Sequence, residues 1–321
     1  MQEKPIIAVT MGDPAGVGPE LCLDLLADAS IAEACTPRIY GDLHVLEACA
    51  KATGKAAPDA SRVLDLQAIA PADFQPGTVS PATGAASYRY ITQAIDEALA
   101  GGVQGVVTAP INKEAIRAAG VSEPGHTEIF SRRTKVERAC MMLTADIMTC
   151  SFVTVHVGYH EVPDLLSVER ILDVIDLTRE AMKRIRGREP RMVVNGLNPH
   201  AGEHGLFGQE EEERIILPAV EAAREAGADL IGPLPPDTAF LEHRRAETDA
   251  YICMYHDQGH IIMKALAFDR AVNTTLGLPF PRTSVDHGTA LDIAWQGLAK
   301  PGSLYAATRL AVQLAGKPVA P

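Results

Sequence analysis

Short apolar runs alternate with longer stretches of helical periodicity along the chain. Runs rich in β-branched residues predict strands at residues 5–10, 105–108, 150–155, 192–195 and 250–253. Between these runs, helical patterns are expected at residues 19–26, 167–185 and 210–225. Alternation of strand and helix is typical of an α/β protein with a mostly parallel sheet. No repeat, low-complexity tract or linker interrupts the pattern, so two lobes would be continuous through shared sheets.

Each predicted strand is followed at once by a polar or glycine-rich loop. Three histidines lie in or beside these loops, just past the ends of three separate strands: His156, His200 and His256. Ligands of α/β proteins bind beyond the carboxyl ends of parallel strands, so the three imidazoles can converge if those strands share an edge. Three neutral nitrogens with an open position suit a divalent metal. The spacing leaves open the alternative that each histidine caps its own turn.

Composition narrows the class of protein. The chain has 321 residues, 47% of them hydrophobic, which is enough for one large domain or two packed ones. A net charge of −12 argues against a nucleic-acid or anionic-membrane surface. The six cysteines contain no C-x-x-C pair and are expected to be reduced packing residues. With neither a signal-peptide pattern nor an apolar run of roughly 18–20 residues, we expect a soluble cytoplasmic protein.

Several common catalytic motifs are missing from the sequence. It has no G-x-G-x-x-G opening a helix, no G-x-x-x-x-G-K-[ST] and no G-x-S-x-G, which argues against a Rossmann half, a P-loop nucleotidase and an α/β-hydrolase elbow. His156 and His160 have the spacing of a helical zinc pair, but the residues around them favour a strand and a turn. The roles of His160 and His260 are left open.

Two segments look suited to an anion. Residues 125–128 (GHTE) precede a predicted helix, where exposed N–H groups bind phosphate, although Thr127 would equally serve as an ordinary N-cap. Farther along, Lys264, Asn273 and Arg282 are spaced through a segment rich in Gly, Thr and Pro. They can gather around an anionic substrate in a net-acidic protein, although scattered surface positions would give the same pattern.

Taken together, these loops resemble the 4-hydroxythreonine-4-phosphate dehydrogenase family of vitamin B6 synthesis. The resemblance covers essentially the whole chain. Its motifs are GDPAGVGPE at 12–20, TAPINK at 108–113, GHTE at 125–128, GLNPHAGE at 196–203, GPLPPDT at 232–238, MYHDQG at 254–259 and the run 273–292.

The resemblance implies roles for individual residues. A divalent ion (Zn, Mg, Co or Mn) would be bound by His156, His200 and His256. The substrate, including its phosphate end, would be held by His126, Thr127, Lys264, Asn273 and Arg282. Asp237 lies in a family motif near the metal. On chemical grounds, Lys264 would also assist proton transfer if neighbouring cations or burial lower its pKa. The family forms homodimers with a shared active site, and we expect the same here.

A second likeness concerns the cofactor. Residues 286–294 look like the adenosine-binding loop of isopropylmalate and isocitrate dehydrogenases, which bind NAD or NADP without a Rossmann fold. The implied cofactor contacts are His287, Gly288, Thr289, Ala290 and Asp292. The implied fold is two α/β/α lobes around a central cleft. The first lobe would span residues 1–130 and 270–321, and the second 131–269.

The implied reaction is NAD-dependent oxidation of 4-phosphohydroxy-L-threonine, after which the β-keto acid product loses carbon dioxide. The chain departs from the usual family pattern at Val157-Gly158 and at His260-Ile261, where the family runs Leu-Pro. GLFG at 205–208 resembles a branch that oxidises 4-phospho-D-threonate or 4-phospho-D-erythronate, which is the alternative substrate class. A branch acting on a terephthalate dihydrodiol is disfavoured because GHTE is retained. A metal-dependent lyase that never uses NAD is the alternative of another class.

Overall fold

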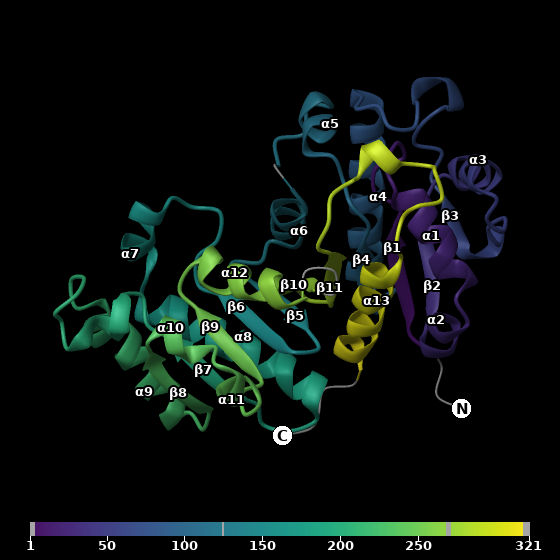
Figure 1. The fold of residues 1–321 in the computed structure, drawn as a ribbon. Coiled ribbons are helices and arrows are strands. Elements are labelled where there is room, and N and C mark those ends of the chain that lie inside the picture. The colour runs from purple at the N-terminus through teal and green to yellow at the C-terminus, as the bar shows by residue number, and fades with distance from the viewer. Residues whose placement is uncertain (1–3, 124, 268–270, 317–321) are drawn as a thin grey trace. The chain divides into compact units, whose positions relative to one another are not determined.

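The computed structural model describes residues 4–123, 125–267 and 271–316 of the chain (Figure 1). These residues form two compact units. One comprises the described residues up to Glu137 together with Leu278–Ala315, and the other comprises the described residues of Arg138–Gly277 together with Gly316. Asn273, which the predicted boundaries assign to the first lobe, lies in the second unit.

The first unit contains a parallel sheet with the strand order β3-β2-β1-β4-β11. Its strands are β1 (Ile6–Thr10), β2 (Thr36–Gly41), β3 (Val63–Asp65), β4 (Gly105–Thr108) and β11 (Arg282–Val285). Every residue of β4 and β11 is buried, as expected for parallel strands covered on both faces.

Seven helices belong to the described part of this unit: α1 (Gly18–Ala27), α2 (Ala29–Ala34), α3 (Leu43–Thr53), α4 (Pro81–Leu99), α5 (Lys113–Ala118), α6 (His126–Thr134) and α13 (Gly302–Ala315). The longest, α4, begins where the Ser80 hydroxyl accepts the Thr83 N–H at 3.2 Å and Pro81 occupies the first helical position. It packs on β1, β2 and α6, whereas α13 packs on β4 and β11.

The second unit contains a mixed sheet with the strand order β10-β5-β6-β9-β7-β8. Its strands are β5 (Cys140–Ala145), β6 (Met148–Phe152), β7 (Arg191–Asn195), β8 (Asp229–Leu234), β9 (Ala250–Cys253) and β10 (Val272–Leu276). Strand β5 runs antiparallel to both β10 and β6, whereas β6, β9, β7 and β8 are mutually parallel. The helices are α7 (Val162–Leu165), α8 (Val168–Arg186), α9 (Leu217–Glu225), α10 (Pro236–Ala239), α11 (Glu242–Arg245) and α12 (His256–Ala267).

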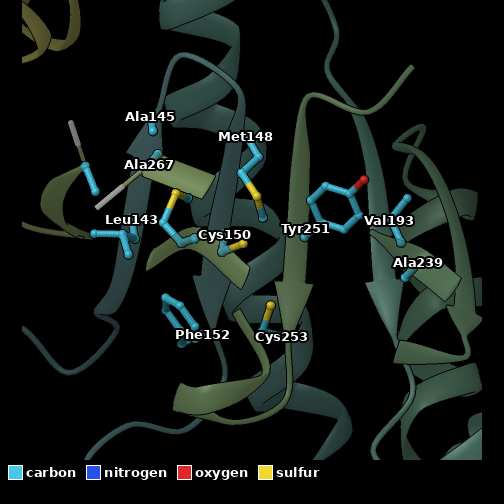
Figure 2. Close-up of a cluster of buried hydrophobic side chains, with 12 residues drawn as sticks. Leu143, Ala145, Met148, Cys150, Phe152, Val193, Ala239, Tyr251, Cys253 and Ala267 are labelled. Carbon is cyan, nitrogen blue, oxygen red and sulfur yellow. The ribbon is translucent and has the colours of Figure 1, made fainter. Parts of the chain in front are cut away.

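An apolar cluster fills the space between this sheet and α12. Figure 2 shows Phe152, Cys150, Tyr251 and Cys253 from adjacent strands, and Met263 of α12 belongs to the same cluster. All six cysteines are buried and free, which confirms the expectation that they are packing residues. Because α12 is anchored by this cluster, its first residue, His256, is held at the carboxyl end of β9.

Most predicted elements appear in the structure, with shifts at their ends. The strand expected at 150–155 is β6, which ends at Phe152 and leaves residues 153–155 in a bend. The helix expected at 210–225 begins as a π-helical turn, η5 (Glu212–Ile216), before α9. No helix among the described residues combines the length and apolarity that a membrane span requires.

Candidate active site

A buried, positively charged side chain, Arg282, lies near α6 in the first unit. Arg282 on β11 is only 2% exposed, donates from Nη2 to the Thr108 hydroxyl at 2.8 Å, and lies 5.3 Å from the ring centre of Phe130. Burial lowers the pKa of Arg282 to about 10, so the guanidinium stays charged at neutral pH. A buried cation held on an aromatic ring is a rigid anchor for an anion.

His126, the first residue of α6, lies beside this cation. Its Nε2 atom is buried and has no hydrogen-bond partner within the described part of the chain. Burial, followed by the charges of Arg282 and Lys113, holds the pKa of His126 well below its ordinary value of 6.5. The imidazole is therefore neutral at neutral pH and offers a hydrogen bond without a charge.

Backbone geometry completes the anion site of the first unit. Gly125 is the N-cap of α6, and no side chain caps its N–H groups, so Thr127 does not serve as the N-cap. A Cβ built on Gly125 would lie 3.6 Å from Lys113 Cε and 3.3 Å from Glu128 Oε2, which places both charged side chains at the helix start. Among the described residues, the helix start thus combines N–H groups without a side-chain cap, a neutral imidazole, the cations Arg282 and Lys113 and the Glu128 carboxylate. The helix start and the cations suit a phosphate.

The predicted cofactor loop lies in the same unit, against the first glycine-rich loop. The Val17 N–H donates to the Thr289 carbonyl at 3.0 Å, and the Trp295 indole donates to the Pro14 carbonyl at 3.1 Å. Gly16 permits this approach, because a Cβ there would lie 2.9 Å from the Thr289 oxygen. His287, Gly288 and Asp292 are exposed, whereas Thr289 is buried and Ala290 has a φ of +44°. Contact of these five residues with a cofactor stays a prediction.

Two of the three predicted metal histidines come together in the second unit. His156 follows β6 with a φ of +52°, and its ring centre is 5.6 Å from that of His256 at the start of α12. Both histidines line a pocket of about 300 Å³. Its other lining residues are Thr154, Val155, Val157, Gly158, Tyr159, Val162, Tyr255 and Asp257. Two imidazoles at this separation can share one divalent ion.

Asp257 orients the His256 ring. One carboxylate oxygen is 2.7 Å from His256 Nδ1, and the other accepts the Tyr159 hydroxyl at 2.5 Å. Hydrogen bonds, first from Tyr159 and then from His256, lower the pKa of Asp257 below its ordinary value. A carboxylate that holds Nδ1–H leaves Nε2 with the lone pair that a metal needs.

His260 packs directly on His256 one turn along α12. The two rings are nearly parallel, with centres 3.6 Å apart, and His260 Nδ1 lies 3.1 Å from the His256 carbonyl oxygen. The Phe152 ring lies 4.6 Å from the ring of His260. His260, whose role the sequence left open, therefore lies in direct contact with the His256 ring.

His200 is not grouped with the other two histidines. It is exposed in the turn η4 (Pro199–Glu203), with a φ of +54°, and its ring lies 6.1 Å from that of Phe207. Among the described residues, no three His, Cys, Asp or Glu side chains are arranged to hold a metal. One copy of the chain therefore presents a histidine pair, and the three-histidine site stays a prediction.

The remaining predicted residues lie on defined elements. Lys264 is on α12 and Asn273 on β10, both in the second unit, and Asp237 is in α10. Their predicted roles in substrate binding and proton transfer stay predictions.

Sequence reasoning missed Tyr159. Its signal was the departure from the family pattern at Val157-Gly158, immediately beside a predicted ligand.

The two α/β units, the anion site and the histidine pair define an α/β enzyme of two units. The fold is similar to that of a beta-decarboxylating dehydrogenase from Thermococcus kodakarensis, with a TM-score of 0.52 and 12% identity over 96% of this chain and 81% of that chain. The family model described as pyridoxal phosphate biosynthetic protein PdxA matches residues 33–311. The chain belongs to this family.

Individual relatives agree with that assignment. The chain is 46% identical over 334 residues to 4-hydroxythreonine-4-phosphate dehydrogenase of Desulfosudis oleivorans, covering 98% of this chain and 97% of the relative. It is 41% identical over 331 residues to D-threonate 4-phosphate dehydrogenase of Salmonella typhimurium, covering 98% and 100%. The crystal structure of 4-hydroxythreonine-4-phosphate dehydrogenase from Klebsiella pneumoniae has a TM-score of 0.85 and 38% identity, covering 97% of this chain and 100% of that chain. The resemblance stated from the motifs is confirmed.

Proposed function

We propose that this dehydrogenase oxidises 4-phosphohydroxy-L-threonine with NAD or NADP, using a divalent metal. The substrate class is proposed from the anion site at the start of α6, where buried Arg282 and neutral His126 lie beside a helix start that has no side-chain cap. Such a site holds a phosphate and fixes which carbon of a short chain faces the cofactor. The hydroxyl to be oxidised is β to the carboxylate, so the product is a β-keto acid that loses carbon dioxide.

D-Threonate 4-phosphate is the second candidate substrate. It carries the same phosphate and the same β-hydroxy acid, so the anion site accommodates either compound. GLFG at 205–208, which resembles the branch acting on 4-phospho-D-threonate and 4-phospho-D-erythronate, supports this alternative. The relative from Salmonella typhimurium also has the name D-threonate 4-phosphate dehydrogenase.

The metal would be held by His156 and His256 of one copy and by His200 of a second copy in a homodimer. His200 is exposed, and near it Leu206 is 70% exposed and Phe207 37% exposed, an apolar surface suited to a partner. His200, Ala201, Glu203 and His204 all have positive φ. Such backbone costs on the order of 1–2 kcal/mol per residue and occurs at functional sites. A bound divalent ion supplies a Lewis acid for the negative charge that develops at the reacting oxygen and in the decarboxylated product.

The proposed roles of the cofactor loop and of the remaining site residues rest on where each lies in the fold. NAD supplies the hydride acceptor, and residues 286–292, docked on residues 12–18, offer it His287, Gly288, Thr289, Ala290 and Asp292. Lys264 lies eight positions after His256, about two turns farther along α12, and its long side chain suits delivery of a proton near the metal site. Thr127 and Asn273 contribute polar contacts to the substrate, and Asp237 carries a carboxylate beside η4, against which α10 packs.

The test is NADH formation with 4-phosphohydroxy-L-threonine, D-threonate 4-phosphate and D-erythronate 4-phosphate, each with and without a chelator. We expect turnover of the first compound, its loss on chelation and its recovery when a divalent metal is added back. Turnover of only the other two would keep the mechanism and assign the second substrate class. If metal binds but no substrate yields NADH, the proposal is wrong and a metal-dependent lyase is favoured.

A further inference from the structure

Bonds from Val153 and Thr154 to Cys253 and Met254 join the two segments that carry His156 and His256 at their base, and a side-chain hydrogen bond from Tyr159 joins them again beyond the histidines. Tyr159 lies three residues after His156, and Asp257 follows His256 directly. The Tyr159 hydroxyl donates to Asp257 Oδ2 at 2.5 Å, while Asp257 Oδ1 engages His256 Nδ1 at 2.7 Å. The hydroxyl therefore joins the loop after β6 to the first turn of α12, at the edge of the pocket that both histidines line.

The loop is shaped to bring Tyr159 to this position. The Gly158 N–H donates to Glu161 Oε2 at 2.7 Å and closes the short turn η3 (Tyr159–Glu161). Where the family usually has proline, this position would have no N–H to donate. A Cβ on residue 158 would also lie 3.0 Å from the Glu161 carboxylate and from the His160 ring. Glycine at 158 and tyrosine at 159 thus belong to one local arrangement.

Ring packing holds the phenol in place as well. The Tyr159 ring meets the Tyr255 ring edge to face, with centres 5.9 Å apart and planes at 90°. Asp257 receives two donors from two different segments, so its orientation is set by both. His156 has a left-handed backbone with a φ of +52°, a conformation that persists only where neighbouring structure holds it.

We propose that Tyr159 is a positioning residue that fixes the separation and orientation of His156 and His256 through Asp257, so that a divalent metal meets a preformed pair. This inference rests on the proposed function of the histidine pair. Loss of an outer-shell partner of a metal-ligating histidine typically weakens metal affinity by about 10–100-fold. Tyr159 is 67% exposed and water competes for its hydroxyl, so the lower end of that range, about tenfold, is expected.

The first measurement is the Zn²⁺ dissociation constant of Tyr159→Phe, by competition with a chromophoric chelator. This variant keeps the ring on Tyr255 and removes only the hydroxyl. We expect about tenfold weaker binding and loss of NADH formation at limiting Zn²⁺, with kcat recovering when Zn²⁺ is saturating. Tyr305→Phe is the matched control, because it removes a hydroxyl that donates to the Asp24 carbonyl at 3.0 Å in the first unit. Its affinity for Zn²⁺ should equal that of the wild type.

A double-mutant cycle tests whether Tyr159 acts through Asp257. The effects of Tyr159→Phe and Asp257→Asn on Zn²⁺ affinity should not add, and the double variant should bind about as well as Asp257→Asn. Additive effects, or an unchanged affinity in Tyr159→Phe, would overturn the inference. His256→Ala separates the two failures: if it abolishes Zn²⁺ binding while Tyr159→Phe does not weaken it, the metal site stands without this positioning. If wild-type protein binds no Zn²⁺, both proposals are wrong.

Discussion

His126 combines a hydrogen-bonding side chain with surroundings that oppose its positive charge. Burial and the cations Arg282 and Lys113 lower its pKa below the ordinary value of 6.5. Below about pH 6.5, His126 binds a proton in the unfolded chain but stays neutral in the folded chain. The stability contributed by neutral His126 is therefore complete above about pH 6.5 and is lost as the pH falls toward the folded pKa.

We predict that His126→Gln, which cannot titrate, loses less stability than the wild type between about pH 7 and about pH 5.5. The slopes of the free energy of unfolding against pH can differ between the two proteins by at most about 1.4 kcal/mol per pH unit, because only one proton is involved. Urea unfolding at several pH values measures both slopes. His243→Gln, at an exposed position of α11, is the control and should follow the wild type. Parallel curves for wild type and His126→Gln would contradict the argument.

At the scale of elements, the loop after β7 depends on one buried carboxylate. Glu212, the first residue of η5, is 2% exposed and accepts the N–H groups of Leu197 and Asn198 at 2.8 and 2.7 Å. Its second oxygen accepts the Asn198 side-chain amide at 2.9 Å. These bonds, to residues 14 and 15 positions before Glu212, hold the backbone that leads into the strained turn at His200.

Replacing this carboxylate should destabilise the fold. Glu212→Gln keeps the shape but removes the charge that strengthens all three bonds, and we expect a loss of about 1.5–3 kcal/mol in the free energy of unfolding. Urea denaturation provides the measurement. Glu221→Gln, on the exposed face of α9, should change stability by less than about 0.5 kcal/mol. Equal stability of the two variants would refute a supporting role for Glu212.

The same elements show what the sequence could and could not predict. Strands such as β4 and β9 were predictable because a run of apolar residues buried on both faces leaves few alternatives. The turn at His200 was not, because the backbone that leads into it is held by Glu212 from later in the chain rather than by local propensity. Tyr159 was missed for a related reason: its partner, Asp257, is 98 residues away in the chain.

At the scale of the whole molecule, the location of His200 bears on whether the metal site is built within one chain or shared between two. Motif resemblance identified three histidines, but the described part of one chain groups only His156 and His256. If the third ligand comes from a second copy, each complete site of a homodimer contains two histidines of one protomer and one of its partner. A C2 dimer then holds two such sites, each with contributions from both protomers.

Mixing two inactive variants distinguishes a shared site from a site within one chain. In a heterodimer of His200→Ala and His256→Ala, a shared arrangement places both defects in one site and leaves the other intact. With random pairing, about a quarter of wild-type NADH formation should return, since half of the dimers are mixed and each has one working site of two. Sites built within one chain would each keep one defect, and mixing would restore no activity. Zn²⁺ bound per dimer, measured on the purified heterodimer, should rise in step with the restored activity.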